Sequence, residues 1–228
     1  MNVKLNGAKL MVGTLLVVTS LSFLGCNDKG ESNQKVDEKL LVGKPDQSNS
    51  KLSQKYFEEG NYKKALEHDK KQLEVDLKFY KEKSAEISLD YNNIGLDYDE
   101  LKEYDHALEY YKKAMKIDDT VLDINSTERS TTYYNVASAY DALGSYSDAL
   151  TYYFKALEID KALSGEFHED VLATYLDIAK LYDQTEKYDT SLTYYEKALA
   201  IQERIYGKED EDTMTTVNII KDLKQKVK

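Results

Sequence analysis

Three observations predict that this sequence folds as an all-α solenoid of stacked antiparallel helix pairs. First, apolar and small residues recur at steps of three and four between Ser130 and Leu163, in two runs separated by Gly144, which indicates two amphipathic helices joined by a tight turn. Second, Ala149 and Ala156 lie inside the apolar stripes, so the two helices can pack closely as a hairpin. Third, the pattern returns every 42 residues, and such repetition is typical of a solenoid, because each hairpin needs neighbours to bury its faces.

The repeat can be followed by adding 42 to a residue number. A weaker copy covers residues 52–65, and a half copy covers residues 214–228 at the end of the chain. The three strong copies share an aromatic residue, small or apolar residues, a second aromatic, and then Tyr, Ala, Tyr and Ala, with one Ser exception. These positions are Tyr91, Ile94, Gly95, Tyr98, Tyr104, Ala107, Tyr111 and Ala114; then Tyr133, Val136, Ala137, Tyr140, Tyr146, Ala149, Tyr153 and Ala156; then Tyr175, Ile178, Ala179, Tyr182, Tyr188, Ser191, Tyr195 and Ala198.

This order of residues resembles the tetratricopeptide repeat from about Asp46 to the end of the chain. The usual repeat has about 34 residues, and the 42-residue period is similar to that of kinesin light chains and related bacterial proteins. Those relatives carry a Gly-containing loop after a lengthened second helix, where this chain has Gly165 and Gly207; their His-Pro pair is replaced by His168 and Glu169. The resemblance implies a right-handed superhelical solenoid of about four hairpins plus a C-terminal capping helix.

Three segments are expected along the chain. Residues 1–25 are predicted to be a lipoprotein signal peptide, 26–45 a flexible polar tether, and 46–228 the repeat array. Within the array, repeats are expected to start near residues 46, 88, 130 and 172, with hairpins near 48–80, 88–121, 130–163 and 171–206 and a capping helix at 213–228. Short polar side chains near the starts of second helices, including Asp105, Asp148 and Asp189, are expected to cap free amides there.

The N-terminal segment has the pattern of a bacterial lipoprotein signal peptide. Lys4 and Lys9 lie before an apolar region that is uncharged from Leu10 to Gly25. This pattern is typical of a secretory signal rather than of a membrane-spanning helix. The segment ends in Leu24, Gly25 and Cys26, which resembles a lipobox, whose cysteine is acylated and becomes the first residue after cleavage. Cys26 is the only cysteine, so no internal disulfide can form. We expect lipid attachment at Cys26 and a location in a bacterial cell envelope; an unmodified thiol in an ordinary signal peptide is the alternative.

Composition and motifs limit the function classes. The formal net charge of -11 argues against nucleic-acid binding, which needs clustered Lys and Arg; it permits a basic partner, and acidity also serves solubility. Twenty tyrosines without tryptophan fit packing between helices, with hydroxyls at the rim. His68, His106 and His168 do not share ligand spacing with one another, and neither a Gly-rich phosphate loop nor a Gly-x-Ser-x-Gly motif is present. The sequence therefore predicts no enzyme, no metal and no cofactor.

The resemblance also implies where a partner would bind. In this family the first helix of each hairpin lines a concave groove that takes extended or helical peptides. Asn93 and Asn135 match a position at which relatives hold a peptide backbone with an Asn amide, which can donate and accept hydrogen bonds; Asp177 replaces them in the next repeat. The alternative is that these asparagines only bond neighbouring helices. The predicted groove residues are Asn92, Asn93, Tyr134, Asn135, Leu176, Asp177 and Lys180.

Acidic residues on the predicted first helices suggest the chemistry of the partner. Glu100, Asp141 and Asp183 would make the groove acidic and favour a basic protein or peptide. The sequence thus predicts a membrane-anchored scaffold that binds a partner segment in its groove. Two alternatives remain open: a structural or assembly lipoprotein without a peptide ligand, and a non-catalytic subunit of an envelope enzyme or signalling system.

Overall fold

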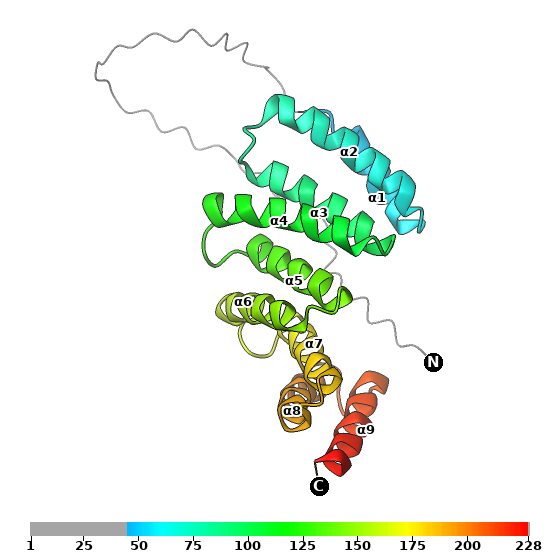
Figure 1. Cartoon of the computed structure of the whole chain (residues 1–228), viewed down its shortest axis with the longest axis vertical. Helices are drawn as coiled ribbons and strands as arrows, with labels where there is room; N and C mark the ends of the chain where they lie inside the picture. The colour runs from blue at the N-terminus through cyan, green and yellow to red at the C-terminus, as the bar shows by residue number, and fades with distance from the viewer. Residues whose placement is uncertain (1–44, 228) are drawn as a thin grey trace, which may run out of the picture.

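The computed structural model describes residues 45–227, and its helices form one elongated stack (Figure 1). All regular secondary structure in this part of the chain is α-helical, which confirms the predicted fold class. The helices are α1 (Ser48–Glu58), α2 (Tyr62–Phe79), α3 (Ala85–Glu100), α4 (Tyr104–Val121), α5 (Thr127–Ala142), α6 (Tyr146–Ser164), α7 (Glu169–Gln184), α8 (Tyr188–Ile205) and α9 (Glu211–Lys226).

Consecutive helices pair as hairpins, and each hairpin packs on the next. The pairs are α1–α2, α3–α4, α5–α6 and α7–α8, and the second helix of each pair also contacts the first helix of the following one. In Figure 1 the stack runs from α1–α2 at one end to α9 at the other, where α9 covers α8. Because each hairpin contacts mainly its neighbours, stability is shared along the array, as expected for a solenoid.

Helix α1 begins at Ser48, as predicted, whereas α3, α5, α7 and the capping helix α9 begin two or three residues earlier than the sequence pattern indicated. Their N-caps are Ser84, Ser126, His168 and Asp210, which lie one period apart, and each side chain accepts a hydrogen bond from a backbone N–H in the first turn. Such caps satisfy amides that lack a partner within the helix. The apolar stripe alone does not mark these starts, because its first apolar residue lies inside the helix.

The expected caps of the second helices are wrong. Asp105, Asp148 and Asp189 lie inside the first turns of α4, α6 and α8, and the N-cap residues there form no side-chain cap bond. A carboxylate inside the first turn still interacts favourably with the positive end of the helix dipole. These aspartates therefore act through electrostatics at the helix start rather than through capping.

The turn inside each hairpin repeats one unusual backbone conformation. Gly60, Lys102, Gly144 and Glu186 lie one period apart and have φ angles of 73°, 62°, 74° and 59°. This left-handed region favours glycine, because a Cβ atom is strained there. Two of the four turns therefore hold a lysine or a glutamate in a conformation that glycine would adopt more easily.

Small residues and tyrosines interlock inside the hairpins. Ala149 and Ala156 are fully buried, which confirms their predicted role as close-approach positions. Tyr111 is also buried, and its ring occupies the space where a side chain at Gly95 would project, since a Cβ atom there would lie 2.5 Å from the ring. The large aromatic of the second helix thus requires a small residue on the first.

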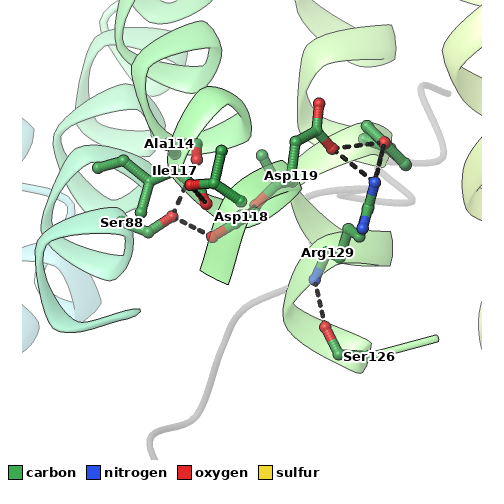
Figure 2. Close-up of polar contacts among 10 residues, drawn as sticks. Ser88, Ala114, Ile117, Asp118, Asp119, Ser126 and Arg129 are labelled. Atoms are coloured by element: carbon green, nitrogen blue, oxygen red, sulfur yellow. Dashed lines mark hydrogen bonds and ion pairs between the residues drawn. The ribbon is translucent and has the colours of Figure 1, made fainter. Parts of the chain in front are cut away.

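Buried hydrogen bonds connect neighbouring hairpins as well as the two helices of one hairpin. The Ser88 hydroxyl donates to the Asp118 carboxylate and also lies 3.2 Å from the carbonyl oxygen of Ala114 (Figure 2). The other oxygen of Asp118 accepts from Thr132 Oγ1 at 2.6 Å, in the following hairpin. One period on, Ser130 donates to Asp160 at 2.5 Å. These buried polar side chains therefore help to fix the register of the helices, in addition to the apolar packing.

We call the interface between the second helix of one hairpin and the first helix of the next a joint. The α2–α3 joint buries carboxyl groups against each other. Asp69 faces Asp97, and Asp76 faces Asp90, and each of the four is less than a tenth exposed. Neither oxygen of Asp97 has a hydrogen-bond donor among the described residues. Because Asp69 is also a carboxyl group, a hydrogen bond between the two requires one of them to carry a proton. Burial, followed by the charge of Asp69, raises the pKa of Asp97 to about 9. Burial, followed by the charge of Asp76, raises that of Asp90 to about 8.

The later joints replace this arrangement with uncharged partners. The positions equivalent to Asp69 and Asp97 are Tyr111 and Ala139 in the next joint, and both are buried. The position equivalent to Asp90 is Thr132, whose hydroxyl donates to Asp118. The α4–α5 joint therefore does not repeat the facing carboxyl pairs of the α2–α3 joint.

The N-terminal predictions concern residues outside the described part. The signal peptide at 1–25, the lipid attachment at Cys26 and nearly all of the tether at 26–45 precede residue 45. No helix within residues 45–227 has both the length and the apolar character needed to cross a membrane.

Candidate partner-binding face

The predicted groove residues lie on α3, α5 and α7, and we call the surface formed by these helices the first-helix face. Asn92, Tyr134, Asn135 and Leu176 are at least nine-tenths buried. In this conformation only Asn93, Asp177 and Lys180 of the predicted set offer more than a tenth of their surface to a partner. The assignment of all seven to partner binding stays a prediction.

Two of the buried groove residues bond to neighbouring hairpins. The Asn92 amide donates to Thr132 Oγ1 at 2.7 Å, which links α3 to α5. The Tyr134 hydroxyl donates to Asp177 Oδ2 at 2.5 Å, which links α5 to α7. Asn135 is buried as well, and its Nδ2 has no acceptor among the described residues. Asn92, one of the predicted groove residues, thus bonds an adjacent helix in this structure.

Asp177 and Lys180 form a charged pair at the surface of α7. Lys180 Nζ lies 2.9 Å from Asp177 Oδ1, and the side chains are 45% and 17% exposed. Each therefore partly neutralises the other, so this pair adds little net charge to the face. The unbalanced negative charge lies further along the first helices, near their C-terminal ends.

A row of acidic residues follows the 42-residue period across the first-helix face. Asp99, Asp141 and Asp183 occupy equivalent positions near the ends of α3, α5 and α7. Each is followed five residues later by a tyrosine that begins the next helix. We call the pairs Asp99–Tyr104, Asp141–Tyr146 and Asp183–Tyr188 the acidic rungs.

An open hollow of about 510 Å³ contains the first two rungs. Its charged residues are Asp99, Glu100, Asp141 and Lys102, so the hollow is acidic. The remaining lining residues are Tyr104, Ser138, Ala142, Tyr146 and Gln184.

The carboxyl groups of these two rungs have raised pKa values. Burial, with a contribution from Glu100, raises the pKa of Asp99 to about 6. Burial and the nearby charge of Asp177 raise that of Asp141 to about 6, against an opposing effect of Lys180. Within residues 45–227, no cationic side chain forms an ion pair with either carboxylate. A cation placed in the hollow would therefore stabilise both ionised forms.

The third rung is occupied by a lysine from the end of the array. Lys226 Nζ of α9 lies 3.1 Å from Asp183 Oδ1 and 4.7 Å from the centroid of the Tyr188 ring. The hydrogen bond to Asp183 is the largest cause of a raised pKa of Lys226. Tyr188 and Lys226 also line a smaller open hollow of about 400 Å³.

Part of this row was predicted from the sequence. Asp141 and Asp183 were among the predicted acidic residues, with Glu100 in place of Asp99. Asp99 is the residue 42 positions before Asp141, so the repeat period carried the signal that identifies the row. The tyrosines were assigned only to packing, and their proximity to the carboxylates depends on the turn geometry.

Within residues 45–227 no group of three or more His, Cys, Asp and Glu side chains could hold a metal ion.

Comparison with known proteins identifies the family. A family model of the tetratricopeptide repeat matches residues 47–120 and 128–204. The chain belongs to the tetratricopeptide repeat family. The predicted family resemblance is thereby confirmed, and the fold of this family implies a scaffold for contacts between proteins. A search of curated protein sequences gave no match to the chain.

Solved structures of similar fold include kinesin-light-chain-like tetratricopeptide proteins. BtubC (BKLC) from P. vanneervenii has a TM-score of 0.69 at 23% identity, over 78% of this chain and 72% of its own. A putative kinesin light chain from Podosopora anserina with nearly identical repeats has a TM-score of 0.69 at 17% identity, over 79% and 85%. The apo form of RapI has a TM-score of 0.65 at 19% identity, over 77% of this chain and 46% of its own. At these identities the likeness establishes the fold alone.

Proposed function

We propose that this tetratricopeptide protein is a membrane-anchored scaffold that binds a segment of a partner protein on its first-helix face. The observation that carries the proposal is the open acidic hollow across the ends of α3 and α5. It lies where successive repeats present equivalent carboxylates, so a partner that crosses several repeats would meet the same charge more than once. Asp99 and Asp141 remain partly exposed. Their carboxylates are therefore accessible to a partner.

The charge of the hollow favours a basic partner. Asp99, Glu100 and Asp141 face a single lysine, Lys102, in its lining. Complementary charge mainly speeds association and selects among partners, and its effect decreases with salt. A basic segment would therefore bind faster and more tightly at low ionic strength than a neutral segment of the same size.

The proposed anchor rests on the N-terminal sequence. An uncharged apolar stretch ends in Leu24, Gly25 and Cys26, and the chain has no other cysteine. Acylation of Cys26 would hold the array at a membrane of the bacterial cell envelope, since two or more acyl chains give stable attachment where one is marginal. The scaffold would then present its first-helix face to proteins close to that membrane.

Recovery of partners with matched surface variants tests the function. The face variant is Asn93→Ala/Gln184→Ala, whose second position lines the hollow and which changes no charge. The control is Lys116→Ala/Glu158→Ala, which changes exposed residues of α4 and α6. Partners should be lost from the face variant and kept by the control, with equal helix content in both. If the control loses the partners and the face variant keeps them, the array acts through its second helices, as an assembly lipoprotein would.

A further inference from the structure

The occupied third rung shows how this array binds an ammonium group. Lys226 reaches Asp183 at 3.1 Å while its Nζ also lies over the Tyr188 ring at 4.7 Å. A carboxylate and an aromatic face attract the same cation by complementary means, since the ring face is electron-rich. Both side chains of the pair are 35–47% exposed, so the ammonium binds at the surface of the array.

The first two rungs repeat the same two chemical groups without such a lysine. Asp99 precedes Tyr104, and Asp141 precedes Tyr146, with the spacing that separates Asp183 from Tyr188. All four residues line one hollow, whose wall includes the ends of three first helices. None of the cationic side chains in the described residues forms an ion pair with Asp99 or Asp141.

We propose that the first and second rungs each bind a lysine ammonium of the partner segment, as the third rung binds Lys226. This inference rests on the proposed function and specifies the side chains that the partner must carry. A lysine suits the site because its compact charge can contact one carboxylate and one ring together, whereas the planar fork of arginine is suited to bidentate contacts.

The spacing of the rungs sets the spacing of the lysines. Helices α3 and α5 contact each other directly, and packed helices lie about 8–10 Å apart. A polyproline II segment rises about 3.1 Å per residue and has three residues per turn, so side chains three residues apart lie about 9 Å apart on the same side of the segment. The partner segment is therefore expected to contain two lysines in the pattern Lys-x-x-Lys.

Binding should depend on pH through the two rung carboxylates. Asp99 is faced by Glu100, and Asp141 by Asp177 and Lys180, with Lys102 in the same hollow. A lysine binds the ionised carboxylate, and protons compete with it below about pH 6, where the pKa values of both groups lie. Affinity is thus highest above pH 7 and falls as the pH is lowered through 6.

A synthetic peptide provides the test. An acetylated and amidated Lys-x-x-Lys peptide is titrated into the full-length protein by calorimetry at low salt, beside the same peptide with norleucine for both lysines. The lysine peptide should bind about tenfold more tightly at pH 7.5, as expected for two partly exposed ion pairs. This comparison does not alter the protein, so it does not depend on whether a variant folds.

Protein variants locate the site. Asp99→Asn/Asp141→Asn should weaken binding of the lysine peptide about tenfold. Asp148→Asn/Glu158→Gln, which removes the same charge from exposed positions of α6, should not. Equal binding of the two peptides, or unchanged binding by the Asp99→Asn/Asp141→Asn variant, would overturn the lysine assignment. If that variant also keeps native partners that Asn93→Ala/Gln184→Ala loses, the first-helix face still binds a partner, but not through the rungs.

Discussion

Tyr134 on α5 donates its hydroxyl to the carboxylate of Asp177 on α7, 43 residues later, with an oxygen–oxygen distance of 2.5 Å. The ring of Tyr134 is buried and packs edge-on against Tyr153 of its own hairpin. One side chain thus joins the core of one repeat to the surface of the next. Burial, with the Asp177 charge as the next contribution, raises the pKa of Tyr134 well above its ordinary value, so the hydroxyl stays a donor.

Tyr134→Phe should remove this link while keeping the ring. A hydrogen bond to a charged group contributes about 1.5–3 kcal/mol, and Asp177 retains Lys180 as a partner, so we expect a loss of about 1–2 kcal/mol. Urea unfolding followed by circular dichroism measures it. Tyr140→Phe is the control, because that tyrosine is only partly buried and its substitution should change stability by less than about 0.5 kcal/mol. Equal effects of the two substitutions would show that the Tyr134 hydroxyl contributes nothing particular.

The acid pairs of the α2–α3 joint predict that the first hairpin loosens as the pH rises. The pKa values of Asp90 and Asp97 are about 8 and about 9 in the folded protein, against about 3.9 in an unfolded chain. The folded state therefore holds protons that the unfolded state has released, and stability falls with rising pH between about 4 and 9. Each acid can contribute up to about 1.4 kcal/mol per pH unit in that window.

A single tryptophan can report this joint, because the chain contains none. In a Phe57→Trp protein, the urea midpoint of the fluorescence change should fall between pH 6 and pH 9. Asp90→Asn/Asp97→Asn in the same background should flatten the dependence, since an amide does not ionise and can donate to the facing carboxylate. A midpoint that is independent of pH in the parent, or that falls equally in the variant, would contradict the role of these pairs.

The left-handed hairpin turns predict that adding a glycine at one turn raises the free energy of unfolding, whereas removing a glycine at an equivalent turn lowers it. Glu186 has a φ of 59° and Gly144 one of 74°. Glu186→Gly should raise the free energy of unfolding by up to about 1 kcal/mol by removing backbone strain, although glycine also has more freedom in the unfolded chain. Gly144→Ala should lower it by about 1 kcal/mol, and no neighbouring atom would obstruct the added methyl group. Thermal unfolding of the two variants beside the parent measures both, and a more stable Gly144→Ala protein would rule out the strain argument.

The close approach of α5 and α6 predicts that Ala149 cannot be enlarged. Ala149 is fully buried, and overpacking of such a site costs about 1–3 kcal/mol. Ala149→Phe should lose that amount in chemical unfolding experiments, whereas Ala200→Phe, at an exposed position of α8, should be close to neutral. The packing account fails if the two substitutions are equally tolerated.

The lipid anchor predicts a change of location for a single substitution. Cys26→Ser removes the only thiol and should transfer the protein from the membrane fraction to the soluble fraction of cells. A stable anchor needs more than one acyl chain, so metabolic labelling with a fatty acid should mark the parent and not the variant. Continued membrane association of Cys26→Ser without label would mean that another part of the chain provides attachment.

Periodicity was sufficient to predict the helix pairs, because a tyrosine at the position of Tyr133 and an alanine at the position of Ala156 occur in every strong copy of the repeat. The polar contacts between hairpins could not be predicted in the same way. Ser88 and Asp118 are 30 residues apart, and their meeting depends on the rotation of one helix against another. That rotation also decides that Asn92 points to Thr132, although family position had suggested a groove residue.

The candidate site was predictable to the extent that it repeats. Asp141 and Asp183 were recognised as acidic residues of first helices, and Asp99 follows from the same period. The contribution of Tyr188 was not visible, because the turn at Glu186 brings α8 back beside Asp183. The contact with Lys226 was also hidden, since it joins residues 43 positions apart across two helices.

Photo-crosslinking in living cells tests the central claim most directly. A photoreactive amino acid is placed at Asn93 on the first-helix face, and in a second protein at Lys116 on α4, the second helix of the same hairpin. We predict a covalent adduct with a partner protein from position 93 but not from position 116, and a weaker adduct from position 93 after Asp99→Asn/Asp141→Asn. Adducts from position 116 alone would contradict the account, because the partner would then lie against the second helices.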